Sequence, residues 1–212
     1  MNVAGNLAAV KQNIERAGRN PDDITIVAVT KGFGADVARE AVSAGLRILG
    51  ENRVQEALAK MPEVEGATWH LIGHLQTNKV KLTLGRFALI QSLDSAHLAE
   101  ALARQDRSQR VLVEVNVSRE SQKSGVAPDG ALELIETAAG LVDVRGLMAM
   151  GPTHGEPRPA FEELRRIRDR AQERLGTALP ILSMGMSGDY EDAAREGSTM
   201  LRLGTALFGP RP

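Results

Sequence analysis

The first side chain that could do covalent chemistry is Lys31, which ends an apolar stretch that starts at Ile24. This stretch, ITIVAVTK, is rich in β-branched residues and predicts a buried strand over 24–31. A lysine at a strand end can extend its amine into solvent, which is the commoner arrangement for an isolated case. Alternatively, an apolar wall lowers the amine's pKa and frees its lone pair to attack an aldehyde, as in a Schiff-base lysine. Spacing alone leaves both interpretations open.

Two later segments combine glycines with small hydroxyl residues: SMGMSGD at 183–189 and RLGTA at 202–206. Backbone N–H groups at a helix N-terminus, together with such hydroxyls, can hold a phosphate. The glycines could also serve only to permit tight turns. Because both segments lie at the ends of predicted strands, opposite a strand-end lysine, we expect a phosphorylated carbonyl ligand. Pyridoxal 5'-phosphate (PLP) carries both the aldehyde and the phosphate that such a site needs.

The histidines do not indicate a metal site. His70 and His74 are four residues apart, but a strand end and a loop separate them, so they do not share a helix face as a zinc pair would. The chain has no Cys and no HExxH motif, and we expect no metal. His70 is expected to be a hydrogen-bonded strand histidine, and Trp69 to pack between strands and helices.

Strand-like and helix-like segments alternate along the chain, with short connections, and predict eight strands, seven intervening helices and a leading helix. The expected strands are 24–31, 47–52, 68–73, 87–93, 110–117, 144–150, 181–186 and 200–208. The expected helices are one from Val3 that Gly18 stops, 35–44, 54–61, 76–84, one capped by Asp94 or Ser95, one opened by Pro128-Asp129, 159–175 and 189–195. Eight such units favour a closed (β/α)₈ TIM barrel, an α/β fold in which chemistry gathers where the strands end. An open doubly wound sheet is the alternative.

Bulk composition narrows the class of protein. The 212 residues contain 42% hydrophobic residues and carry a formal net charge of −1, which indicates neither a nucleic-acid nor a membrane-surface partner. The N-terminus does not resemble a signal peptide, and no apolar run approaches a membrane span. We expect one domain over 1–212 in a cytoplasmic protein.

Seven segments, in order, resemble the pyridoxal phosphate homeostasis protein family, the YggS/PROSC type of PLP-binding protein. They are AVTK, GENRVQE, WHLIGHLQTNK, EVNVSRESQKSG, GLMAMGP, LSMGMSGDYEDA and RLGTALFG. The resemblance runs from about Ile24 to Gly209, and GENRVQE, WHLIGHLQTNK and SMGMSGD are its most specific parts. It implies a single TIM barrel like the N-terminal domain of alanine racemase, here with an extra N-terminal helix.

The resemblance also implies PLP as the cofactor, held as a Schiff base on Lys31. The residues matching the family's cofactor contacts are Ser187, Gly204 and Thr205 for the phosphate, Arg202 for the pyridine nitrogen, and Asn52 and Met148 for the ring. One departure lies beside the lysine. The family commonly reads SKT or SKF before a proline-containing segment, whereas this chain reads Thr30-Lys31-Gly32-Phe33-Gly34. A more flexible loop is therefore expected there.

The resemblance implies a protein that buffers or delivers PLP in vitamin B6 homeostasis, with apo-PLP enzymes as possible recipients and no established turnover. The alternative is a cryptic amino-acid racemase or decarboxylase. A two-base racemase needs a second acid/base group, supplied in racemases by a tyrosine from another subunit's second domain, and a cover that excludes water. This chain has one tyrosine, Tyr190, and no second domain is expected. We therefore favour a monomeric carrier without catalytic residues.

Overall fold

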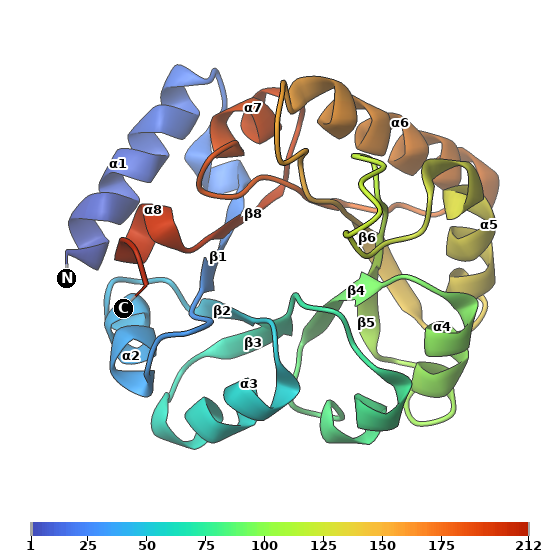
Figure 1. The fold of residues 1–212 in the computed structure, drawn as a ribbon, viewed down its shortest axis with the longest axis horizontal. Helices are drawn as coiled ribbons and strands as arrows, with labels where there is room; N and C mark the ends of the chain where they lie inside the picture. Colours follow the sequence, from blue (N-terminus) through green and yellow to red (C-terminus); the bar gives the residue numbers. More distant parts are fainter. Residues whose placement is uncertain (1, 212) are drawn as a thin grey trace.

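The computed structural model describes residues 2–211, and its eight strands form a closed parallel barrel in sequence order. Each strand pairs with the next, and β1 pairs with β8 to close the ring (Figure 1). The strands are β1 Thr25–Val29, β2 Ile48–Glu51, β3 Thr68–Leu71, β4 Leu89–Leu93, β5 Arg110–Glu114, β6 Asp143–Met148, β7 Ile181–Ser183 and β8 Met200–Leu203. The predicted (β/α)₈ barrel is confirmed, and the open sheet is wrong.

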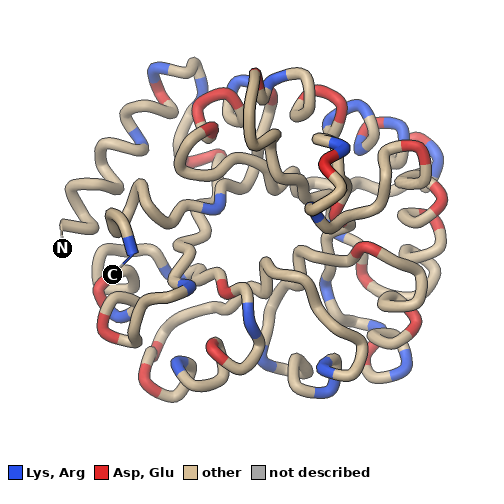
Figure 2. The backbone as a smooth tube through the Cα atoms, in the orientation of Figure 1, with Lys and Arg blue, Asp and Glu red and all other residues tan. Residues whose placement is uncertain are grey.

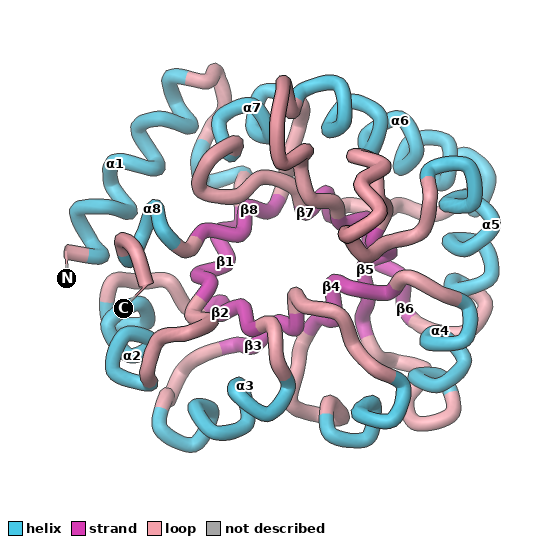
Figure 3. The backbone as a smooth tube through the Cα atoms, viewed as in Figure 1, coloured by secondary structure: helices cyan, strands magenta, loops and turns pink. Residues whose placement is uncertain are grey.

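Helices form an outer ring around the strands (Figure 3). The α-helices are α1 Val3–Arg16, α2 Ala35–Ser43, α3 Val54–Lys60, α4 Ala96–Ala103, α5 Pro128–Ala139, α6 Arg158–Leu175, α7 Tyr190–Arg195 and α8 Thr205–Phe208. Three short 3₁₀ helices are η1 Pro21–Asp23, η2 Met61–Glu63 and η3 Thr77–Leu82. The leading helix α1 packs against α8, which lies near the C-terminus in Figure 1.

Two predicted elements differ from the structure in type. The strand expected over 200–208 ends at Leu203, because Gly204 (φ −113°, ψ −80°) turns the chain and the following residues form the single turn of α8. The α-helix expected over 76–84 is instead the 3₁₀ helix η3, the tighter form that short helical segments often take. The strand expected over 181–186 also stops early, at Ser183.

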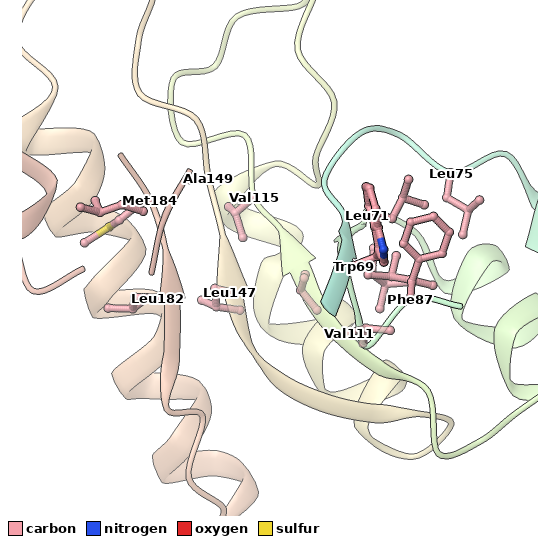
Figure 4. Packing of buried hydrophobic residues seen from close by; sticks show 14 of the residues in the cluster. Trp69, Leu71, Leu75, Phe87, Val111, Val115, Leu147, Ala149, Leu182 and Met184 are labelled. Carbon is pink, nitrogen blue, oxygen red and sulfur yellow. The ribbon is translucent and has the colours of Figure 1, made fainter. Parts of the chain in front are cut away.

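The buried apolar residues form two clusters. The larger cluster fills the space between barrel and helices, and Figure 4 shows one part of it, where Trp69, Leu71, Leu75 and Phe87 pack together. The expected position of Trp69 is therefore confirmed. The smaller cluster lies inside the barrel, on the strand positions that alternate with the outward ones. Its buried members are Val27, Leu89, Leu112, Met148 and Met200.

Charged residues lie mainly on the outer helices and loops, and few lie on the strands of the ring (Figure 2). Within residues 2–211, no helix combines the length and the apolar character that crossing a bilayer requires. Two charged residues at strand ends, Lys31 after β1 and Arg202 on β8, line the cavity described below.

Candidate functional site

A cavity of about 270 Å³ opens at the carboxyl ends of β1, β2, β6, β7 and β8. Its volume is close to the lower end of the range for small-molecule sites. All seven predicted site residues line it: Lys31, Asn52, Met148, Ser187, Arg202, Gly204 and Thr205. They come from five separate segments of the chain, and the barrel brings them together because the carboxyl ends of parallel strands meet at one rim. Their roles toward a ligand remain predictions.

Lys31 follows β1 and its side chain is half-buried at the cavity. Burial lowers the pKa of its amine, and the guanidinium groups of Arg211 and Arg202 lower it further. The carboxylates of Glu51 and Glu56 act in the opposite direction without reversing the shift. At neutral pH, more of this amine carries a free lone pair than an exposed lysine would, which suits attack on a carbonyl carbon.

The loop beside Lys31 has defined contacts. Gly32 has a φ of 78°, in the left-handed region that favours glycine, and its N–H donates to Glu56 Oε1 at 2.7 Å. The Phe33 N–H donates to the Thr30 carbonyl at 3.1 Å, and the Phe33 ring packs against Phe208 with 5.5 Å between ring centroids. The departure from the family pattern at 32–34 thus gives a loop tied to both α3 and α8.

Arg202 lies on β8 with its side chain buried under the cavity. Its Nη1 donates to the Ser183 carbonyl at 2.7 Å and to Ser183 Oγ at 2.8 Å, and its Nη2 donates to the Ala149 carbonyl at 2.9 Å. Burial lowers the pKa of this guanidinium to about 10, with the nearby Glu114 and Asp189 opposing the shift. Arg202 therefore remains charged at neutral pH, and its partners are neutral oxygen atoms.

A chain of hydrogen bonds continues from Arg202 across the barrel interior. Ser183 Oγ donates to Gln91 Oε1 at 2.6 Å, and the Gln91 amide nitrogen lies 3.1 Å from His70 Nδ1. An amide nitrogen can only donate, so His70 accepts at Nδ1 and carries its proton on Nε2. Burial lowers the pKa of His70 to about 4, which keeps it neutral. The expectation of a hydrogen-bonded strand histidine is confirmed.

The loops after β7 and β8 meet at the cavity. Ser187 Oγ accepts a hydrogen bond from the Ala206 N–H at 3.0 Å, which joins the two loops. Gly204 ends the strand and Thr205 begins α8, while at Gly188 open space remains where a Cβ would stand. Two hydroxyls and a glycine-rich backbone therefore border the same part of the cavity.

The remaining wall is apolar apart from one amide. Met148 is buried, belongs to the apolar cluster inside the barrel and forms part of the cavity floor, while Met150 and Met186 also line the cavity. Asn52 follows β2, and Gly73 packs so closely on its backbone that a Cβ there would come within 2.3 Å of the Asn52 carbonyl oxygen. A flat ring could lie against this wall with its polar substituents elsewhere.

Sequence reasoning missed several polar residues of this region. Glu114 ends β5 on the inward face, is 3% exposed, and its pKa is raised to about 7 by burial and by the charge of Asp94, against the effect of Arg202. The signal for it was a single glutamate within the apolar strand RVLVEV. Arg211 lines the cavity from near the C-terminus, and no sequence pattern pointed to it.

The donor set of the cavity fits a phosphorylated aldehyde. Within residues 2–211, the cavity is lined by three basic residues, Lys31, Arg202 and Arg211, and by no carboxylate. Hydroxyls and cations attract a phosphate, while an amine of lowered pKa suits an aldehyde carbon. This observation on the residues is independent of any relative.

Comparison with known proteins gives relatives over the whole chain. The family model for the alanine racemase N-terminal domain matches residues 5–212. A curated relative from Aquifex aeolicus, named pyridoxal phosphate homeostasis protein, is 42% identical to this chain. The match covers all of this chain and 99% of the relative.

Solved structures agree with this result. PipY of Synechococcus elongatus, whose structure has PLP bound, is 34% identical with a TM-score of 0.85, and the match covers 98% of this chain and all of that one. Alanine racemase of Clostridium difficile is 16% identical with a TM-score of 0.80, and the match covers all of this chain and 60% of the racemase. At that identity the racemase supports the fold alone.

Proposed function

This chain belongs to the pyridoxal phosphate homeostasis protein family, and from that premise we propose that it binds PLP through Lys31 and serves in PLP homeostasis. The observation that carries the proposal is the cavity in which a lysine of lowered pKa shares one space with Ser187, Thr205 and Arg202, without a lining carboxylate within residues 2–211. The PLP bound to PipY, a relative at 34% identity, supports the same ligand.

The linkage we propose is a Schiff base. The neutral Lys31 nitrogen would attack the aldehyde carbon, a C=N bond would form and the aldehyde oxygen would leave as water. The step is reversible, and hydrolysis would return the free amine and the aldehyde. When bound, PLP supplies that aldehyde and a ring able to withdraw electrons. The lowered pKa of Lys31 favours this reversible step because only the neutral amine attacks.

The other residues orient the ligand. Ser187 and Thr205 would donate their hydroxyls to the phosphate, with backbone N–H groups near Gly204 adding to them. Arg202 would face the ring nitrogen, held by its bonds to Ser183 and Ala149. A fixed guanidinium there disfavours protonation of the ring nitrogen, which weakens the ring as an electron sink.

We propose a carrier or buffer without turnover, rather than a racemase or decarboxylase. The single tyrosine, Tyr190, is 8% exposed, and its hydroxyl accepts a hydrogen bond from Asn13 Nδ2 at 2.7 Å. Within residues 2–211, the cavity lining contains no tyrosine, histidine or carboxylate that could serve as a second acid/base group. The recipients of PLP would be apo-PLP enzymes.

Transfer to an apoenzyme tests this proposal. Purified protein titrated with PLP should develop the absorbance of a PLP imine, and loaded protein should restore activity to an apo-PLP enzyme. A scavenger of free PLP separates the two homeostatic roles: transfer that survives it means delivery, and transfer that it abolishes means buffering. Steady-state racemisation or decarboxylation of a common amino acid by the pure loaded protein would contradict the carrier proposal, and absence of imine absorbance would contradict PLP binding through lysine.

A further inference from the structure

The two residues that flank Lys31 are both tied from behind the barrel wall. Thr30 is fully buried, and its Oγ1 donates to Glu51 Oε1 at 2.6 Å while its carbonyl accepts from Lys60 Nζ at 2.8 Å. On the other side, the Gly32 N–H donates to Glu56 Oε1 at 2.7 Å. The backbone on each side of Lys31 is therefore fixed by side chains of β2 and α3.

Lys60 is the centre of this arrangement. Its Nζ lies 2.7 Å from Glu51 Oε1, 2.9 Å from Glu56 Oε1 and 2.8 Å from the Thr30 carbonyl, which uses all three donors of an ammonium. Lys60 ends α3, and Glu56 precedes it by one helical turn. The three charged residues Glu51, Glu56 and Lys60, called the rear network below, lie outside the barrel wall and do not line the cavity.

The cost of burial argues that the rear network is more than a packing device. Glu51 is fully buried, Lys60 is 6% exposed, and Glu51 Oε2 has no hydrogen-bond partner. Removing such charges from water is expensive, and apolar residues of similar volume often serve packing as well or better. In this network, four of the five hydrogen bonds described above end on Thr30, on Gly32 or on the carboxylate that accepts from Thr30.

The restraints act on the turn that carries Lys31. Lys31 and Gly32 lie between the Thr30 carbonyl and the Phe33 N–H that donates to it at 3.1 Å, and Lys31 lines the cavity. Fixing Thr30 and Gly32 therefore fixes the backbone from which the Lys31 side chain reaches the cavity. We propose that Glu51, Glu56 and Lys60 are positioning residues that direct the Lys31 amine into the cavity and set its electrostatic surroundings. This proposal deepens the proposed function, on which its biological meaning rests, but it concerns a property of the ligand-free chain.

The charges of the rear network allow a test by the direction in which each substitution shifts the pKa of Lys31. Glu51 and Glu56 raise the pKa of Lys31 against the larger effects of burial and the arginines. Glu51→Gln and Glu56→Gln keep an oxygen acceptor but remove an anion, so each should lower the pKa of Lys31. Lys60→Met removes the cation that neutralises both carboxylates, so this substitution should raise the pKa of Lys31. A loss of stability alone would not produce shifts of opposite sign.

The experiment is competitive acylation of the lysines of PLP-free protein over a range of pH, read peptide by peptide by mass spectrometry. The exposed Lys81 serves as the reference in each sample. The Lys31-to-Lys81 rate ratio at pH 8 should rise about threefold in each Glu→Gln variant and fall by a similar factor in Lys60→Met, because only the neutral amine is acylated. Should Lys60→Met fail to fold, the two isosteric Glu→Gln variants still decide the question.

Glu196→Gln is the matched control. Glu196 is a buried carboxylate paired with Arg158 and Arg165, and it does not line the cavity. Its substitution should leave the Lys31 ratio at the wild-type value. If the rear-network variants give the same ratio as Glu196→Gln, the positioning proposal is wrong. If their ratios shift as stated while wild-type protein forms no imine with PLP, the positioning proposal stands and the proposed function fails.

Discussion

The two sides of the cavity are held by different kinds of chemical group. On the β1–β2 side, which carries Lys31, the backbone is held by buried charged side chains: Glu51 and Lys60 form an ion pair with 2.7 Å between Oε1 and Nζ. On the β7–β8 side, the loops are joined through a serine hydroxyl and a backbone N–H, and Arg202 is held by neutral oxygens. The amine proposed to react is thus supported by charged residues, whereas the surface proposed to bind the phosphate consists of hydroxyls, glycines and backbone donors.

This difference has an electrostatic reason. An anion site needs N–H and O–H groups free to point at the ligand, and a nearby carboxylate would repel a phosphate. The amine needs a fixed direction and a controlled pKa, which charges behind the wall can provide without entering the cavity. We therefore expect substitutions on the β1–β2 side to change folding stability and substitutions on the β7–β8 side to change PLP binding.

The largest effect is expected on the amine side. Lys60→Met leaves Glu51 and Glu56 without their cation, and breaking a buried pair by removing one partner costs about 3–5 kcal/mol. Urea unfolding of the PLP-free protein measures this loss. The double variant Lys60→Met/Glu51→Gln should recover part of it because the uncompensated buried charge is gone. A loss below about 1 kcal/mol in the single variant would mean that the pair is not effectively buried.

Glu114, at the end of β5 across the barrel, should make stability depend on pH. Its pKa is raised from 4.5 to about 7 in the folded chain, so the folded state holds a proton that the unfolded state releases. Its contribution is complete below pH 4.5 and disappears as pH rises to about 7, with a ceiling of about 3 kcal/mol. Glu114→Gln should flatten the stability profile over that interval and leave a protein more stable than wild type at pH 8. Parallel profiles for the two proteins would contradict the raised pKa.

The smallest effect is expected on the anion side. Ser187→Ala and Thr205→Ala should each weaken PLP binding by about 1–3 kcal/mol, the loss of one charge-assisted hydrogen bond, while stability changes little. Binding of pyridoxal, which lacks the phosphate, provides the control and should be unaffected. Unchanged PLP affinity in the double variant would remove these hydroxyls from the phosphate site.

The residues that line the cavity could be predicted from the sequence far better than the rear network behind Lys31. Lys31 and the segments 183–189 and 202–206 are contiguous motifs whose residue types indicate their chemistry, and the family resemblance added Asn52 and Met148. All seven predicted residues line the cavity, whereas Arg211, which also lines it, was missed. The rear network joins three residues whose contact depends on how α3 packs on β2 (Figure 1), and no local pattern encodes that packing. The last strand was predicted too long because the apolar residues of α8 extend the pattern of β8, and only the backbone turn at Gly204 separates them.

The most direct test of the account is to locate the covalent bond. PLP-loaded protein is reduced with borohydride, which fixes an imine as a stable secondary amine, and its peptides are mapped by mass spectrometry. The account predicts the PLP adduct on Lys31, and loss of the reducible species in Lys31→Ala. A reducible species at undiminished occupancy in Lys31→Ala, or a wild-type adduct on another lysine with Lys31 unmodified, would contradict it.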